Sequence, residues 1–183
     1  VDPDLGPELV QLSSSVLIES DSAFVGKPGG LLPLSDGTVV LADFFSNRAL
    51  RYDSDGSLLK VYGRQGRGPG EIGSIGGPMF EYGGLLGIVD YGPRKVDLFE
   101  IETGEHRGTV FYEGLVTGAH AAGSHVWLSG IDEFSGKGLA ILDEQRIRDM
   151  STGRDVAPIS FSLLDVPDIY MDSEVIRGVY GLA

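Results

Sequence analysis

The sequence contains no cysteine, few basic residues and no long apolar run. The absence of cysteine excludes disulfides and thiolate metal sites, although it does not fix a compartment. Lys and Arg number 14 against 27 Asp and Glu, which gives a formal net charge of −13 at pH 7. Phosphate binding draws on a basic patch, so this charge argues against nucleic acids and anionic membranes as partners. No run approaches the roughly 20 apolar residues of a membrane span, and none is predicted.

Glycine and proline are abundant instead, at 28 and 9 of the 183 residues, and 42% of the chain is hydrophobic. This composition is natural for one globular domain that is built of many turns rather than of long helices. Residues 1–10 have neither the basic start nor the apolar core of a signal peptide, which a mature chain would lack in any case.

Residues 36–71 predict three strands and two tight reversals. β-Branched and apolar residues run together at 38–43, as expected of a strand that is buried on both faces. Two further strands are expected at 48–53 and 57–63. Between them stands the turn dipeptide Asp55-Gly56, whose glycine tolerates positive φ. The pattern describes an antiparallel meander with short connections.

The same signature recurs downstream at intervals of roughly 40–50 residues. The segment 85–90 repeats 38–43, so that Asp43 and Asp90 end equivalent strands, and 125–130 is a weaker third copy. Four-stranded units at this spacing are typical of a β-propeller, and we therefore predict an all-β fold of antiparallel blades. The blades are expected at residues 31–70, 78–114 and 115–153, with the fourth strand of the third blade near 147–152.

The two ends of the chain have separate expected roles in such a ring. Residues 14–20 are a candidate ring-closing strand, and residues 154–183 are a candidate start of a further blade. Three blades plus two partial ones leave two blade faces uncovered. We therefore expect the chain to be a fragment or one half of an oligomeric ring, in which open blade edges favour self-association.

Residues 36–71 resemble an NHL repeat, in which a strand ending in Asp precedes an Asn-Arg connection, a second strand, an Asp-Gly turn and a glycine-rich loop. The run GRGPGE at 66–71 is most similar to the six-bladed, NHL-like propellers of secreted bacterial proteins. The resemblance covers roughly residues 30–150 and implies a six-bladed ring outside the cytoplasm. It implies a fold and no particular function.

Asp43 and Asp90 are each followed a few residues later by an arginine, Arg48 and Arg94 respectively. The carboxylates are expected to accept hydrogen bonds from turn N–H groups or to pair with that arginine. The alternative is that they ring the channel mouth as ligands of a hard cation such as Ca²⁺, which takes about 6–8 oxygens.

The loop at 63–71 carries Arg64 and Arg67 among several glycines. It lacks the Lys-Ser or Lys-Thr ending of a P-loop and opens no helix, so an inter-blade crossover is expected. The alternative is anion capture, in which both arginines hold a carboxylate or sulfate of a ligand by bidentate hydrogen bonds.

His120 and Glu81 lie on predicted innermost strands, where side chains can face the channel. His106 lies in a charged turn and is expected to be solvated. A catalytic zinc site needs about three protein ligands and a water. No cofactor is therefore predicted, and Ca²⁺ or Zn²⁺ bound by Asp43, Asp90 and His120 is the alternative.

Two functions follow from these residues. The first is a non-enzymatic scaffold without catalytic residues, which binds a protein, peptide or carbohydrate at the channel mouth through Arg64, Arg67, His120 and Glu81. The second resembles the gluconolactonase or amidating-lyase propellers, where a channel metal polarises a carbonyl or activates water in a hydrolase or lyase. That enzyme needs several convergent ligands on innermost strands, which here offer Glu81 and His120, so the scaffold is favoured.

Overall fold

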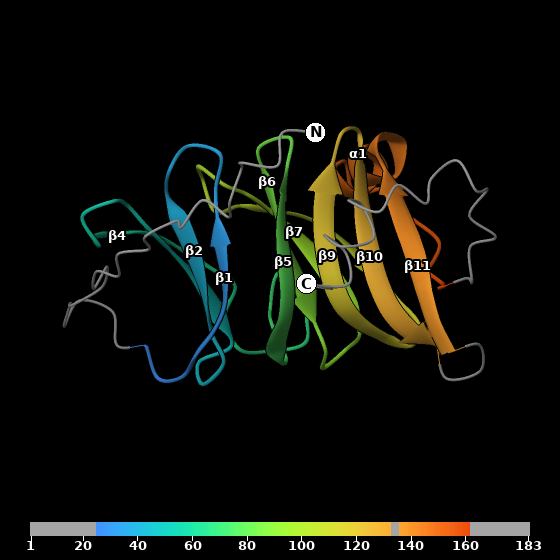
Figure 1. Ribbon diagram of the computed structural model, residues 1–183, viewed down its shortest axis with the longest axis horizontal. Coiled ribbons are helices and arrows are strands. Elements are labelled where there is room, and N and C mark those ends of the chain that lie inside the picture. Colours follow the sequence, from blue (N-terminus) through green and yellow to red (C-terminus); the bar gives the residue numbers. More distant parts are fainter. Residues whose placement is uncertain (1–24, 133–135, 162–183) are drawn as a thin grey trace, which may run out of the picture.

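The computed structural model describes residues 25–132 and 136–161, which form three antiparallel β-sheets and one short helix (Figure 1). The first sheet contains β1 (Pro28–Pro33), β2 (Val39–Asp43), β3 (Arg48–Tyr52) and β4 (Leu58–Tyr62). The second contains β5 (Ile75–Tyr82), β6 (Leu85–Asp90), β7 (Lys95–Glu100) and β8 (His106–Phe111). The third contains β9 (Leu115–Ala122), β10 (His125–Asp132) and β11 (Gly136–Asp143).

Each sheet is a meander in which consecutive strands are neighbours. In the first sheet, the Asp-Gly turn between β1 and β2 has Gly37 at φ 86°, and the one between β3 and β4 has Gly56 at φ 80°, a region that glycine enters without steric strain. Asp43 ends β2 opposite Arg48, and Asp90 ends β6 opposite Lys95. The two aspartates therefore hold equivalent positions, and the predicted repeat is confirmed.

The sheets stack side by side, with β5 in contact with both β1 and β9, as Figure 1 shows. Alternate residues of the second sheet face opposite neighbours, because side chains on a strand point to its two faces in turn. Ile88 packs toward the first sheet, whereas Val89 packs toward the third. Two apolar cores thus hold three blades of a β-propeller together, and the predicted all-β fold class is confirmed.

The fourth strand predicted near 147–152 is wrong, because the chain forms helix α1 (Glu144–Ser151) there. Asp143 caps the helix by accepting a hydrogen bond from Arg146 N at 2.7 Å. Ile147 and Met150 are buried and belong to the core between the second and third sheets. Within the described residues the third sheet has three strands, and α1 contacts both β8 and β11.

After the helix the chain returns to the outer strand of the second sheet. Ile159 N donates to Phe111 O at 2.8 Å, and Glu113 N donates to Ile159 O at 2.9 Å. The predicted ring-closing strand at 14–20 and most of the predicted further blade at 154–183 lie outside the described residues. Among the residues that are described, no helix has the length and apolar character needed to cross a membrane.

Candidate functional site

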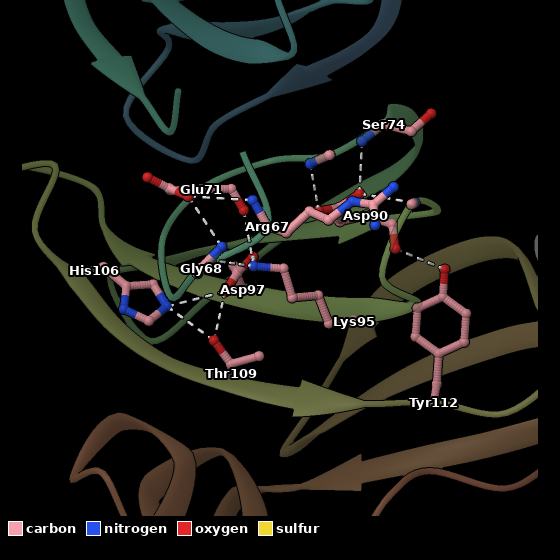
Figure 2. Close-up of polar contacts among 12 residues, drawn as sticks. Arg67, Gly68, Glu71, Ser74, Asp90, Lys95, Asp97, His106, Thr109 and Tyr112 are labelled. Atoms are coloured by element: carbon pink, nitrogen blue, oxygen red, sulfur yellow. Dashed lines mark hydrogen bonds and ion pairs between the residues drawn. The ribbon is translucent and has the colours of Figure 1, made fainter. Parts of the chain in front are cut away.

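The turn that follows β6 is anchored by the carboxylate of Asp90, which is fully buried (Figure 2). Its Oδ2 accepts a hydrogen bond from Gly73 N at 2.7 Å, and its Oδ1 accepts from Ser74 N at 2.8 Å and Gly92 N at 3.0 Å. Tyr112 Oη donates to the Asp90 carbonyl at 3.1 Å. This one residue therefore ties together the entry to β5, its own turn and the end of β8.

Asp43 anchors the equivalent turn of the first sheet. Its Oδ1 accepts from Lys27 N at 3.2 Å and from Phe45 N at 3.1 Å, and Arg48 Nε lies 3.4 Å from Oδ2. Burial by itself raises the pKa of Asp43, but hydrogen bonds from Lys27 N and the Ser46 hydroxyl outweigh it, and the pKa is lowered overall. The carboxylate is thus held ionised as a backbone anchor.

The strand register shows that Lys95, in the second sheet, is the residue equivalent to Arg48 in the first sheet. Arg48 pairs across the turn with Asp43, and Lys95 pairs across the next turn with Asp90. Arg94 instead takes the position of Asn47, and both have positive φ, at 58° and 48°. Arg94, the arginine that follows Asp90 in the sequence, therefore precedes the register equivalent of Arg48 by one residue.

Lys95 and Asp97, which sequence reasoning missed, form a buried ion pair with Nζ 2.8 Å from Oδ2. Thr109 Oγ1 donates to Asp97 Oδ1 at 2.5 Å, and His106 Nε2 lies 3.0 Å from the same oxygen. Burial alone raises the pKa of Asp97, but His106, Lys95 and Thr109 outweigh it and hold the pKa below its usual 3.8. The solvated position predicted for His106 is wrong, because this side chain is only 24% exposed.

The buried pair also fixes the glycine loop between the first two sheets. Lys95 Nζ donates to Gly68 O at 2.7 Å and to Glu71 O at 2.8 Å. Glu71 Oε2 in turn accepts from Gly68 N at 3.0 Å and from Arg67 N at 3.2 Å (Figure 2). The hydrogen bond from Gly68, followed by that of Arg64, lowers the pKa of Glu71. The loop is therefore held from inside by an ammonium group and from outside by a carboxylate.

The two arginines of this loop have different surroundings. Arg64 pairs with Glu71, with Nη2 2.9 Å from Oε1, although its side chain is 81% exposed. Arg67 is exposed, and across residues 25–132 and 136–161 its guanidinium takes part in no hydrogen bond or ion pair. Arg67 is thus the predicted ligand-binding residue that presents a cation to solvent from a loop held by hydrogen bonds to Lys95 and Glu71.

Glu81 and His120 are not brought together with these arginines. Glu81 lies at the far end of β5 from the loop and accepts hydrogen bonds from Ser35 N at 2.7 Å and Ser35 Oγ at 2.6 Å. It borders a cavity of about 540 Å³ at the hairpin ends. His120 is exposed on β9 opposite Trp127. In the described part of the chain, no three His, Asp or Glu side chains are grouped closely enough to hold a metal ion.

Comparison with known proteins shows likeness in fold. No protein-family model and no curated protein matches the chain. An exported protein of Bacteroides fragilis has a TM-score of 0.57 at 14% identity, over 70% of this chain and 38% of its own length. The computationally designed Ika4 protein has a TM-score of 0.51 at 15% identity, over 82% of this chain and 88% of its own. BamB of Moraxella catarrhalis has a TM-score of 0.49 at 18% identity, over 70% of this chain and 35% of its own length.

The likenesses to the Bacteroides protein and to Ika4, whose TM-scores exceed 0.5, agree with the stacked blades described above. The chain spans 38% of the Bacteroides protein, so it corresponds to a part of that structure. At such low identity they show a β-propeller fold alone, and the NHL resemblance stays a prediction.

Proposed function

We propose that this chain is part of a non-enzymatic, NHL-like propeller that acts as a binding or assembly scaffold. Its ligand contacts the face that carries the inter-blade loops, and Arg67 binds a carboxylate on a protein or peptide partner. A six-bladed ring is the architecture that this proposal assumes. Arg64 plays a secondary part, because its guanidinium is shared with Glu71.

The observation that carries the proposal is the restraint of the loop that presents Arg67. Lys95 is 1% exposed and holds two loop carbonyls, while Glu71 holds two loop amides. A loop that is already ordered loses little conformational entropy when a ligand arrives, which favours binding. An arginine side chain can hold a carboxylate through two parallel N–H···O bonds.

The test uses an array of immobilised, end-blocked peptides in which each Glu-containing peptide is paired with its Gln counterpart. Wild-type protein should prefer the acidic member of a pair, and Arg67→Ala should lower that preference about tenfold. Arg154→Ala is the matched control, because Arg154 is 70% exposed and its removal changes the net charge equally. Equal retention of acidic and amide peptides by wild type, or an equal loss in both variants, would refute the proposal.

An extracytoplasmic location belongs to the same proposal. Its support is the resemblance to secreted propellers and the shared fold of an exported protein. Fractionation of the native cells followed by immunoblotting should place the protein in the periplasmic or secreted fraction. Recovery in the cytoplasmic fraction alone would contradict this part of the proposal.

A further inference from the structure

A second cavity, of about 320 Å³, opens between the second and third sheets beside the turn that follows β6. Its volume lies at the small end of the range of ligand pockets, roughly 300–1,000 Å³. Among the residues that the structure describes, six from that turn, the end of β8 and the third sheet line it: Tyr91, Arg94, Tyr112, Gly114, Leu115 and Ile131.

The junction between the first and second sheets has an asparagine, Asn47, at the turn position that Arg94 occupies beside this cavity. There, Asn47 Oδ1 accepts a hydrogen bond from Ile75 N at 3.0 Å, so a short side chain joins the turn to the start of β5. Arg94 occupies the same turn position in the second sheet, and it faces the cavity together with Leu115 at the start of β9. The two junctions therefore share a backbone geometry but differ in this side chain.

Both tyrosine hydroxyls in the cavity walls already donate hydrogen bonds to the protein, which leaves the aromatic rings and two aliphatic side chains as its apolar surface. Tyr91 Oη donates to Val116 O at 2.7 Å, and Tyr112 Oη donates to Asp90 O at 3.1 Å. Leu115 and Ile131 are register partners on β9 and β10, and they are 44% and 41% exposed at the rim. An apolar ligand group would therefore remove both from water.

Arg94 is the one charged residue among the six that line the cavity. Arg94 acts electrostatically on Tyr112 in the cavity wall. Burial raises the pKa of the Tyr112 hydroxyl, and the positive charge of Arg94 offsets part of this rise. Arg94 also has a partner within the protein, but a guanidinium carries five N–H donors and can share them with a carboxylate.

We propose that this cavity binds a ligand that joins a small apolar group to a carboxylate. A free apolar acid and the C-terminal residue of a peptide share this chemistry. No residue of the loop that presents Arg67 is among the described lining residues, so this proposal can fail or succeed independently of the scaffold proposal.

The test is titration of the ¹⁵N-labelled protein with N-acetyl-leucine, N-acetyl-leucinamide and acetate, followed by NMR. N-acetyl-leucine should shift the amides of Gly114 and Leu115, and the amide analogue should bind about tenfold more weakly because it lacks the charge. Acetate should not saturate the site, since it lacks the apolar group. The tripeptide N-acetyl-Gly-Gly-Leu distinguishes the sources: tighter binding than N-acetyl-leucine identifies a peptide terminus, and equal or weaker binding a free acid.

Two variants locate the interaction. Arg94→Asn places the residue of the equivalent turn at a position with positive φ, and it should reduce binding of the acid to the level of the amide. Leu115→Ser should weaken both ligands, whereas Arg67→Ala should change neither. Equal binding of acid and amide by wild type, retention of acid binding by folded Arg94→Asn, or shifts confined to another surface would each overturn the proposal.

Discussion

Asn47 and Arg94 occupy the same turn position in successive blades, and both adopt positive φ, at 48° and 58°. This region disfavours most residues with a Cβ, whereas asparagine tolerates it. Asn47 uses the geometry to accept a hydrogen bond from Ile75 N. The same turn conformation thus places a hydrogen-bond acceptor, Asn47, between the first and second sheets and a cavity-lining residue, Arg94, between the second and third.

Asn47→Ala should lower the free energy of unfolding by about 2–5 kcal/mol. Alanine at positive φ costs roughly 1–2 kcal/mol, and the buried Ile75 N–H loses its acceptor at a cost of roughly 1–3 kcal/mol. Asn47→Gly removes the acceptor without the strain and should cost less than alanine, and Asn47→Asp, which retains an oxygen, should cost least. Urea denaturation of the three variants checks this order, and a glycine variant as unstable as alanine would contradict the strain component.

Asp90→Ala should be more destabilising than removal of any exposed turn aspartate. Three backbone amides lose their acceptor in a fully buried position, which predicts a loss of about 3 kcal/mol or more. Asp53→Ala is the control, because Asp53 also accepts turn amides, from Asp55 and Ser57, but in an exposed position where water replaces it. Chemical denaturation should show a loss of about 1 kcal/mol or less for the control. Similar losses in both variants would mean that Asp90 is not a buried anchor.

The repeat and most strand bounds could be predicted from the sequence because their signals are local. A β-branched run that ends in Asp, and an Asp-Gly turn, specify a strand and a reversal without knowledge of distant residues. The segment 85–90, for example, was predicted with the bounds that β6 has. Pairing that joins non-repeated segments, such as Ile159 with Phe111, leaves no such local signal.

Helix α1 and the buried ion pair were missed although weak signals exist for both. Asp143 is a favourable N-cap, and Ile147 and Met150 are spaced at i, i+3, as on one face of a helix. Lys95 and Asp97 stand two residues apart in an apolar strand, hence on the same face. What the sequence could not show is that this face is buried under the glycine loop, because that depends on the neighbouring sheet.

The free energy of unfolding should fall as the pH is lowered below about 5. Burial favours protonation of Asp97, but its bonds to His106, Lys95 and Thr109 prevail, so its pKa is lower in the folded than in the unfolded chain. A carboxyl group shifted in this direction stabilises the fold above its unfolded pKa of about 3.8, and the contribution is lost as the pH falls through the folded value. Urea denaturation between pH 7 and pH 3 measures this loss.

The share of Asp97 in the acid sensitivity can be isolated with a double variant. Lys95→Met alone should cost about 3–5 kcal/mol, because it leaves a buried carboxylate uncompensated. Lys95→Met with Asp97→Asn removes both charges and should recover part of that loss. Its stability should also depend less on pH than that of wild type, by up to about 1.4 kcal/mol per pH unit between pH 5 and pH 3. Parallel pH curves for wild type and the double variant would show that Asp97 does not titrate with folding.

Gly108→Ala should displace helix α1 from the second sheet. A Cβ at Gly108 on β8 would overlap the carbonyl group of Met150, which is backbone and cannot move aside without the helix. Displacement would expose Ile147 and Met150, so we expect a loss of about 3 kcal/mol or more in the free energy of unfolding, from their apolar burial. Gly30→Ala on β1 is the control, because its Cβ would meet neighbours only at 3.4 Å and beyond. If denaturation and far-UV circular dichroism show both variants to be equally stable, α1 does not pack on β8 as described.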